Sequence, residues 1–327
     1  MSVKYYQYTA ALFALLLSVA ACKDKEYAIP EPNGGLGNDV IKRSLGPNLV
    51  GQKIEFAYAM ALPADKGKLE SATVEASIAG APTTYLEHRS FYTNASGNDV
   101  GVEVGAPSVN KDNTTSVSFT RDTMAATLRY FYVVPEEARG KTVNFKFSAK
   151  ASNGETVSYS MGPYNVSTMD MKLDLKVVDN AACYISIADM AVYTAAEAAA
   201  QPDKIDLVYV FRTPTNYLHS ILSPGADPQY LPGVTLPAGV NKVTKLVRAW
   251  NLRDQQLARL QFGVFIDDLD FQKQGFEDAA NLALNLKEEA GLWIETADGK
   301  YKAYLFINSV SNTGKTATIS IKRYTAK

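Results

Sequence analysis

The fold is decided by residues 128–161, which read LRYFYVVPEEARGKTVNFKFSAKASNGETVSYSM. The first residues of this stretch are mostly aromatic and β-branched, and these side chains favour strands. Pro135 and Gly140 then break the chain, and residues 143–149 alternate apolar with other side chains. Asn153-Gly154 has the turn chemistry of a β-hairpin, after which the alternation resumes. The stretch therefore predicts successive antiparallel strands.

Alternating strands also fill the regions on either side. Residues 51–127 contain short runs in which apolar residues occupy every second position, with turns between them. Several short strands without a helical period are typical of a sandwich, so we expect an Ig-like β-sandwich over residues 51–168. Residues 170–177 alternate with a strict period of two, and the chain closes in two hairpins. We expect a mainly β fold in which residues 169–327 form a β-rich domain with a few short helices.

Two segments of this second domain predict the helices. Thr194 and Glu197 have the spacing of a capping box, and Pro202 ends the alanine-rich run that follows. Residues 252–260 carry leucines at helical spacing. Between them, residues 205–211 are nearly all apolar, which predicts a strand covered on both faces.

The N-terminus has the pattern of an export signal. Lys4 precedes an apolar run at residues 10–21, which is shorter than the roughly 20 residues that span a bilayer. The run ends in Val19-Ala20-Ala21-Cys22, which resembles a bacterial lipobox. We expect residues 1–21 to be a signal peptide and Cys22 to be lipidated. An ordinary secretory signal with a chance cysteine is the alternative.

The residues after Cys22 predict where the protein is held. Lys23-Asp24-Lys25-Glu26 resembles the surface-export signal of Bacteroidota lipoproteins, although any solvated linker could begin in this way. Prolines and glycines are frequent up to residue 50, so residues 22–50 are expected to form a flexible tether behind the lipid. We expect a lipid-anchored protein of the outer membrane that faces the cell exterior, with the membrane as a partner.

Composition excludes several classes of protein. The 33 basic and 34 acidic residues give a net charge of −1, which argues against a nucleic-acid partner. With Cys22 lipidated, Cys183 is the one remaining thiol, so no intramolecular disulfide is expected. Cys183 lies in an apolar run and is expected to be buried and inert. Gly314-Lys315-Thr316 imitates a P-loop, but Ser309 stands where that motif needs glycine. We expect no cofactor.

Aromatic residues provide the candidate contact surface. Trp250 lies among polar neighbours, and an exposed indole can stack on the apolar face of a sugar ring. Tyr217 and Tyr230 lie in a proline-containing loop, and such loops can carry function when a rigid scaffold presents them. Trp250, Tyr217 and Tyr230 are therefore the candidate ligand-binding residues. Trp293 has apolar neighbours and is expected in the core.

Two further motifs allow chemistry or modification. Asp267, Asp268 and Asp270 follow an apolar run, and such carboxylates could bind Ca²⁺, serve a glycosidase as acid and base, or simply cap a helix. Thr123 lies in Asp122-Thr123-Met124, which matches the O-glycosylation sites of exported Bacteroidota proteins.

The lipobox, the tether and the predicted first domain combine with the runs YISIADMAVYTAAEAAA at residues 184–200 and KIDLVYVF at residues 204–211. Together they resemble a family of Bacteroidota outer-membrane and surface lipoproteins with an N-terminal Ig-like domain. The resemblance implies location and fold class, but no catalytic residue.

These expectations favour a non-catalytic surface binding protein for a glycan or another extracellular ligand. The alternatives are a structural or assembly subunit of a surface protein complex, and a glycoside hydrolase that uses the aspartates at 267, 268 and 270.

Overall fold

The computed structural model describes residues 34–213 and 217–326. The fold is mainly β, as the alternating runs predict, with antiparallel sheets and short helices. Within the described residues, no helix is long and apolar enough to cross a membrane. The predicted signal peptide at residues 1–21 and the predicted lipidation site Cys22 lie outside the described residues.

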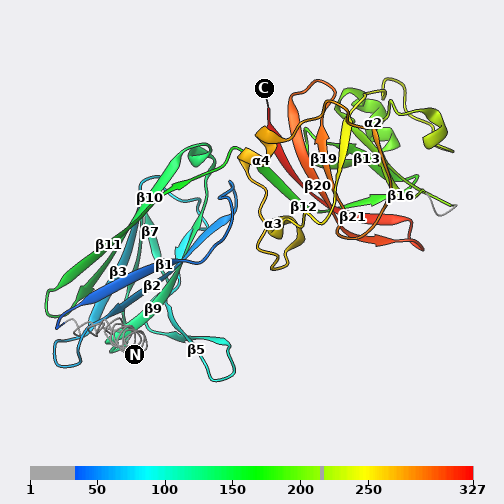
Figure 1. The fold of residues 1–327 in the computed structure, drawn as a ribbon. Helices are drawn as coiled ribbons and strands as arrows, with labels where there is room; N and C mark the ends of the chain where they lie inside the picture. Colours follow the sequence, from blue (N-terminus) through cyan, green and yellow to red (C-terminus); the bar gives the residue numbers. More distant parts are fainter. Residues whose placement is uncertain (1–33, 214–216, 327) are drawn as a thin grey trace, which may run out of the picture. The chain divides into compact units, whose positions relative to one another are not determined.

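Two sheets pack face to face in the first half of the chain (Figure 1). One sheet has the order β1 (Gly37–Lys42), β2 (Lys53–Ala61), β9 (Ala125–Val133), β4 (Tyr85–Leu86). The other has the order β11 (Thr156–Asn165), β10 (Thr142–Ala151), β3 (Leu69–Ala76), β8 (Thr114–Ser118), β7 (Val109–Lys111). A separate hairpin joins β5 (Arg89–Thr93) to β6 (Asp99–Glu103).

Aromatic rings fill the space between these sheets. Because side chains alternate along a strand, every second residue of β2, β9 and β10 points inward. The ring of Phe56 lies 4.9 Å from that of Phe145 and 5.3 Å from that of Phe147, centroid to centroid. The hairpin predicted at Asn153-Gly154 joins β10 to β11, and Gly154 has a φ of 88°.

The predicted tether is too long at its C-terminal end. Residues 37–42 form β1, which pairs with β2 from Gly37 opposite Ala61 to Lys42 opposite Phe56. Leu36, Val40 and Leu49 are buried. The sequence hides this strand because Gly37, Asn38 and Asp39 are residue types that strands rarely contain. Residues 36–50 therefore belong to the folded protein.

A second pair of sheets follows. One has the order β12 (Asp170–Val178), β21 (Thr316–Thr325), β20 (Tyr301–Ser311), β19 (Gly291–Glu295), β17 (Lys245–Ala249). The other has the order β14 (Ala191–Thr194), β13 (Ala182–Ser186), β15 (Leu207–Arg212), β16 (Leu218–Leu222), β18 (Leu282–Leu286). The described residues form the helices α2 (Ala195–Ala200), α3 (Gln255–Ala258) and α4 (Asp268–Lys273), and the 3-10 turns η1 (Glu136–Ala138), η2 (Pro202–Lys204) and η3 (Pro228–Tyr230).

Local signals located the first of these helices correctly. The Thr194 side chain accepts from the backbone N–H of Glu197, and the Glu197 carboxylate accepts from that of Thr194, so the predicted capping box is present. The helix predicted at residues 252–260 is much shorter, since α3 covers only Gln255–Ala258.

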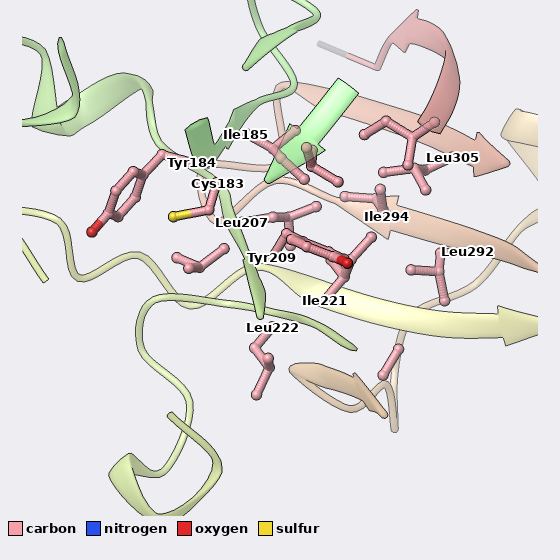
Figure 2. Packing of buried hydrophobic residues seen from close by; sticks show 14 of the residues in the cluster. Cys183, Tyr184, Ile185, Leu207, Tyr209, Ile221, Leu222, Leu292, Ile294 and Leu305 are labelled. Carbon is pink, nitrogen blue, oxygen red and sulfur yellow. The ribbon is translucent and has the colours of Figure 1, made fainter. Parts of the chain in front are cut away.

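The central strands of the β17-containing sheet are covered on both faces. Leu292 and Ile294 point into the core between the two sheets, together with residues of β13, β15 and β16 (Figure 2). Trp293 points the other way and packs against Phe271 of α4 and Tyr304, with ring centroids 5.3 and 4.8 Å apart. Trp293 is therefore a core residue, as predicted. α3, α4 and their loops cover this second face (Figure 1).

A buried ion pair connects the segment that contains α3 and α4 to the sheet that it covers. Lys322 of β21 lies with its Nζ 2.6 Å from the Asp254 carboxylate, and both side chains are fully buried. Lys322 also donates to the Ile266 carbonyl oxygen at 2.9 Å. Asp254 in turn accepts from the backbone N–H groups of Leu257 and Ile266.

We predict that Lys322→Met lowers the free energy of unfolding by about 3–5 kcal/mol, because it leaves the Asp254 carboxylate buried without its cation. Urea denaturation would measure the change. Lys176→Met, at an exposed position of β12, is the matched control and should shift stability by less than about 0.5 kcal/mol. Similar effects of both substitutions would contradict a role for the buried pair.

Candidate functional site

Strand pairing brings two distant segments together at one edge of the second pair of sheets. β17 pairs antiparallel with β19, and Ala249 lies opposite Gly291. The chain leaving β17 therefore runs beside the chain entering β19. A hollow of about 360 Å³ at this point is lined on one wall by residues 248–251 and Arg253, and on the other by Asn285 and residues 287–290.

Tyr304 restrains one of the two segments that line this hollow. Its hydroxyl donates to the Leu252 carbonyl oxygen at 2.5 Å and so holds the segment after β17. Gly291 leaves the room for this contact, because a Cβ there would lie 1.8 Å from the hydroxyl oxygen. On the opposite wall, the backbone N–H of Glu289 donates to the Ile307 carbonyl oxygen at 2.8 Å.

The end of β17 leads from the core to the hollow. Leu246, Arg248 and Trp250 follow one another at intervals of two positions, so the strand directs Leu246 and Arg248 to the same face. Leu246 is buried, Arg248 is half-buried, and Trp250 is 78% exposed beyond the strand end. The Arg248 guanidinium lies 4.9 Å from the centroid of the Trp250 ring. The structure thus presents an indole at the surface, where Trp250 was predicted to make contacts.

A second arginine connects the segment after β17 to the segment before β19. Arg253 pairs with Glu289 at 2.8 Å, and its guanidinium also lies over the Phe262 ring, 5.1 Å from the centroid. Asn251 and Asn285, which also line the hollow, have φ values of 55° and 52°. Asparagine tolerates this left-handed conformation better than most residues. These features give the hollow defined walls of polar groups.

Tyr217 and Tyr230 form a separate pair. Their ring centroids lie 6.3 Å apart, and neither residue lines the hollow at Trp250. The Tyr217 carbonyl oxygen accepts from the backbone N–H of Asn285, which does line it. The hollow at Trp250 therefore does not include the tyrosine pair.

The acidic cluster has a structural role in the fold. Asp267 is the N-cap of α4 and accepts from the backbone N–H groups of Leu269 and Asp270, while the Asp270 carboxylate accepts from the N–H of Asp267. Asp268 accepts from the Ser167 hydroxyl at 2.5 Å. Within residues 34–213 and 217–326, no three His, Cys, Asp or Glu side chains gather as metal ligands. The helix-cap alternative is the one that the structure shows.

Thr123 offers no free hydroxyl for glycosylation in the folded chain. The residue is buried, and its hydroxyl donates to the Arg121 carbonyl oxygen at 3.0 Å. Because a glycosyl acceptor must be reached from solvent, this geometry argues against the predicted O-glycosylation.

Cys183 and His219 are both buried. Burial raises the pKa of the Cys183 thiol to about 11, which keeps it protonated and unreactive at neutral pH. The Tyr209 hydroxyl lies 2.6 Å from Nδ1 of His219, and the Asn312 amide oxygen lies 2.8 Å from Nε2. Since an amide oxygen can only accept, Nε2 carries the proton and Tyr209 donates to Nδ1.

Comparison with known proteins places the chain in a family. The profile of a domain of unknown function, DUF4466, matches residues 33–166. A crystal structure of a DUF4466 family protein from Parabacteroides merdae is 47% identical, has a TM-score of 0.85, and covers 90% of this chain and 100% of that one. The chain belongs to the DUF4466 family. A second domain of unknown function, DUF8576, matches residues 167–326.

This finding confirms the predicted likeness to a Bacteroidota family, while the lipid anchor and the Ig-like character stay predictions. No curated protein matches this DUF4466 family member. AvmM, which catalyses macrocyclization in alchivemycin A biosynthesis, is 10% identical over 41% of this chain and 90% of that one, with a TM-score of 0.24. MyfA, the major subunit of Myf fimbriae from Yersinia enterocolitica, in complex with galactose, is 10% identical over 40% and 98%, with a TM-score of 0.23. Neither likeness carries an argument.

Trp250 is the one residue of the hollow's described lining that the sequence predicted as a contact residue, and the charged residues Arg248, Arg253 and Glu289 are among those that were missed. The spacing of Leu246, Arg248 and Trp250 could have placed Arg248 beside the indole, because strand residues two apart share a face. The pairing of Arg253 with Glu289 had no such signal, since it depends on the register between β17 and β19.

We predict that the stability of this family member falls as the pH drops below about 6.5, where an unfolded histidine begins to bind a proton. Burial lowers the pKa of His219, against the opposing effect of its hydrogen bond to Asn312, so the folded state resists that proton. The expected slope from His219 is at most about 1.4 kcal/mol per pH unit. Urea denaturation between pH 5 and 7 should show a shallower dependence for His219→Gln, and an unchanged slope would refute this.

Proposed function

We propose that the protein is a lipid-anchored, non-catalytic protein of the outer membrane that binds a glycan through the hollow at Trp250. The observation that carries the proposal is the exposure of the Trp250 indole, which at 78% exceeds that of every other large apolar side chain in the described part of the chain. An exposed indole at the rim of a polar hollow suits the apolar face of a sugar ring.

Groups elsewhere in the fold support binding over catalysis. Asp267 and Asp270 accept hydrogen bonds that cap α4, which is a structural use for these carboxylates. Cys183 is buried with a raised pKa, and His219 is buried between two hydrogen-bond partners. Asp267, Asp270, Cys183 and His219 thus have roles in packing or capping.

The proposed location rests on the N-terminal sequence. The lipobox at Cys22 and the charged residues after it favour a lipid anchor and display on the outer surface. The 47% identical structure from Parabacteroides merdae supports a Bacteroidota setting, in which such signals are used. Mass spectrometry of the native protein tests the anchor: an acylated Cys22 supports it, and an unmodified thiol at residue 22 refutes it.

We predict that Trp250→Ala abolishes retention of the protein on a glycan array while changing the free energy of unfolding by less than about 0.5 kcal/mol, because the side chain is exposed. Trp293→Ala is the matched control for stability, since this buried indole should cost about 3–5 kcal/mol. If the wild-type protein binds no glycan, or if Trp250→Ala binds as tightly, the proposed site is wrong.

A further inference from the structure

Arg248 differs from every other arginine of the protein. All ten arginines lie in the described part of the chain. Nine of them have a carboxylate within 4.0 Å: Arg43, Arg89, Arg121, Arg129, Arg139, Arg212, Arg253, Arg259 and Arg323. Among the described residues, no carboxylate lies within that distance of Arg248.

The guanidinium of Arg248 is also partly removed from water. Its side chain is half-buried, and this burial lowers its pKa from the usual arginine value. The group nonetheless stays protonated, because the arginine pKa starts far above neutrality. A half-buried cation without an anionic partner is an unfavourable arrangement that an incoming anion would relieve.

The donors of Arg248 are largely available. A guanidinium has five N–H donors, and in the described residues Arg248 uses Nη2 in one long bond of 3.4 Å to the Asn285 carbonyl oxygen. Contact with the Trp250 ring holds the planar group in place. Carboxylates pair with such a planar fork through two parallel hydrogen bonds.

The charges around Arg248 favour an anion. Arg248, Arg253 and Lys287 line the hollow with Glu288 and Glu289, which leaves a net charge of +1 (three positive, two negative). Arg253 and Glu289 neutralise each other at 2.8 Å. The volume of about 360 Å³ lies at the small end of the range for small-molecule sites, which suits one or two sugar rings.

We propose that this hollow takes an acidic saccharide, with a sugar ring stacked on the Trp250 indole and a uronate carboxylate paired with the Arg248 guanidinium. The inference rests on the proposed function and narrows it from glycans in general to carboxylated ones. The flat indole favours a sugar over an acidic peptide, because a pyranose ring offers a matching apolar face.

The test compares carboxylated polysaccharides with the same chains after reduction of their carboxyl groups. Full-length protein is titrated calorimetrically with oligomers of polygalacturonate, alginate and hyaluronan, each in native and carboxyl-reduced form. We expect at least one native oligomer to bind and its reduced form to bind about 10- to 100-fold more weakly, which is the range for a lost charge-assisted hydrogen bond.

Variants identify the residue responsible. Arg248→Gln should reduce the affinity for the native oligomer by a similar factor, and should weaken binding of the reduced oligomer much less, because that ligand has no carboxylate to pair with the guanidinium. Arg248→Lys should also weaken native binding, because a lysine keeps the charge but loses the planar fork. Arg259→Gln, at an exposed arginine outside the hollow, is the control and should bind as the wild type does. Thermal melting of each variant checks that it folds.

The outcomes separate this inference from the proposed function. Equal affinity for native and reduced oligomers, or undiminished native binding by Arg248→Gln, overturns the acidic-saccharide inference but leaves glycan binding in place. Binding to polyglutamate as tight as to the native oligomers, or to neutral or sulfated glycans alone, also overturns it. If no acidic, neutral or sulfated glycan binds, both proposals are wrong.

Discussion

The buried ion pair between Lys322 and Asp254 holds together the two layers on which the hollow is built. Lys322 stands on a central strand, and Asp254 opens the segment that covers that strand's outer face. Burying two charges is unfavourable unless the remaining donors and acceptors are also satisfied. Here Asp254 accepts from two backbone N–H groups and Lys322 donates to a carbonyl oxygen. The pair therefore holds the segment that contains α3 and α4 in one position against the sheet.

This position determines the conformation of the residues that carry the hollow. Residues 250–253 lie between Ala249, which is paired with Gly291, and Asp254, which is held by Lys322. Tyr304 adds a third restraint through its bond to Leu252. Trp250 is therefore exposed on a backbone that is fixed at both ends. A site ordered before its ligand arrives loses less conformational entropy on binding, so less of the contact energy is offset.

Sequence reasoning succeeded where the signal was local and failed where it depended on strand register. The cap at Thr194 and the turn at Asn153-Gly154 are set by residues within a few positions of one another, and both are present. The strand at residues 37–42 was missed because its composition is that of a linker, and pairing with β2 overrides composition. Trp250 could be selected from its polar neighbours. Its surroundings could not, because they come from a segment about forty residues later that only the pairing of β17 with β19 brings near.

The two arginines of the hollow show why one side chain can be structural and the other functional within the same few residues. Arg253 has its charge neutralised by Glu289, and the pair joins the two walls. Arg248 leaves the strand on the face that Leu246 occupies in the core, where the edge of the sheet partly removes it from water. Among the described residues, no carboxylate pairs with the Arg248 guanidinium at this position. Had Glu289 paired with Arg248, the charge beside the indole would be neutralised, and the unpaired arginine of the hollow would be Arg253. Because Glu289 pairs with Arg253, the uncompensated charge lies next to Trp250, where a ligand's ring and its carboxylate can be held together.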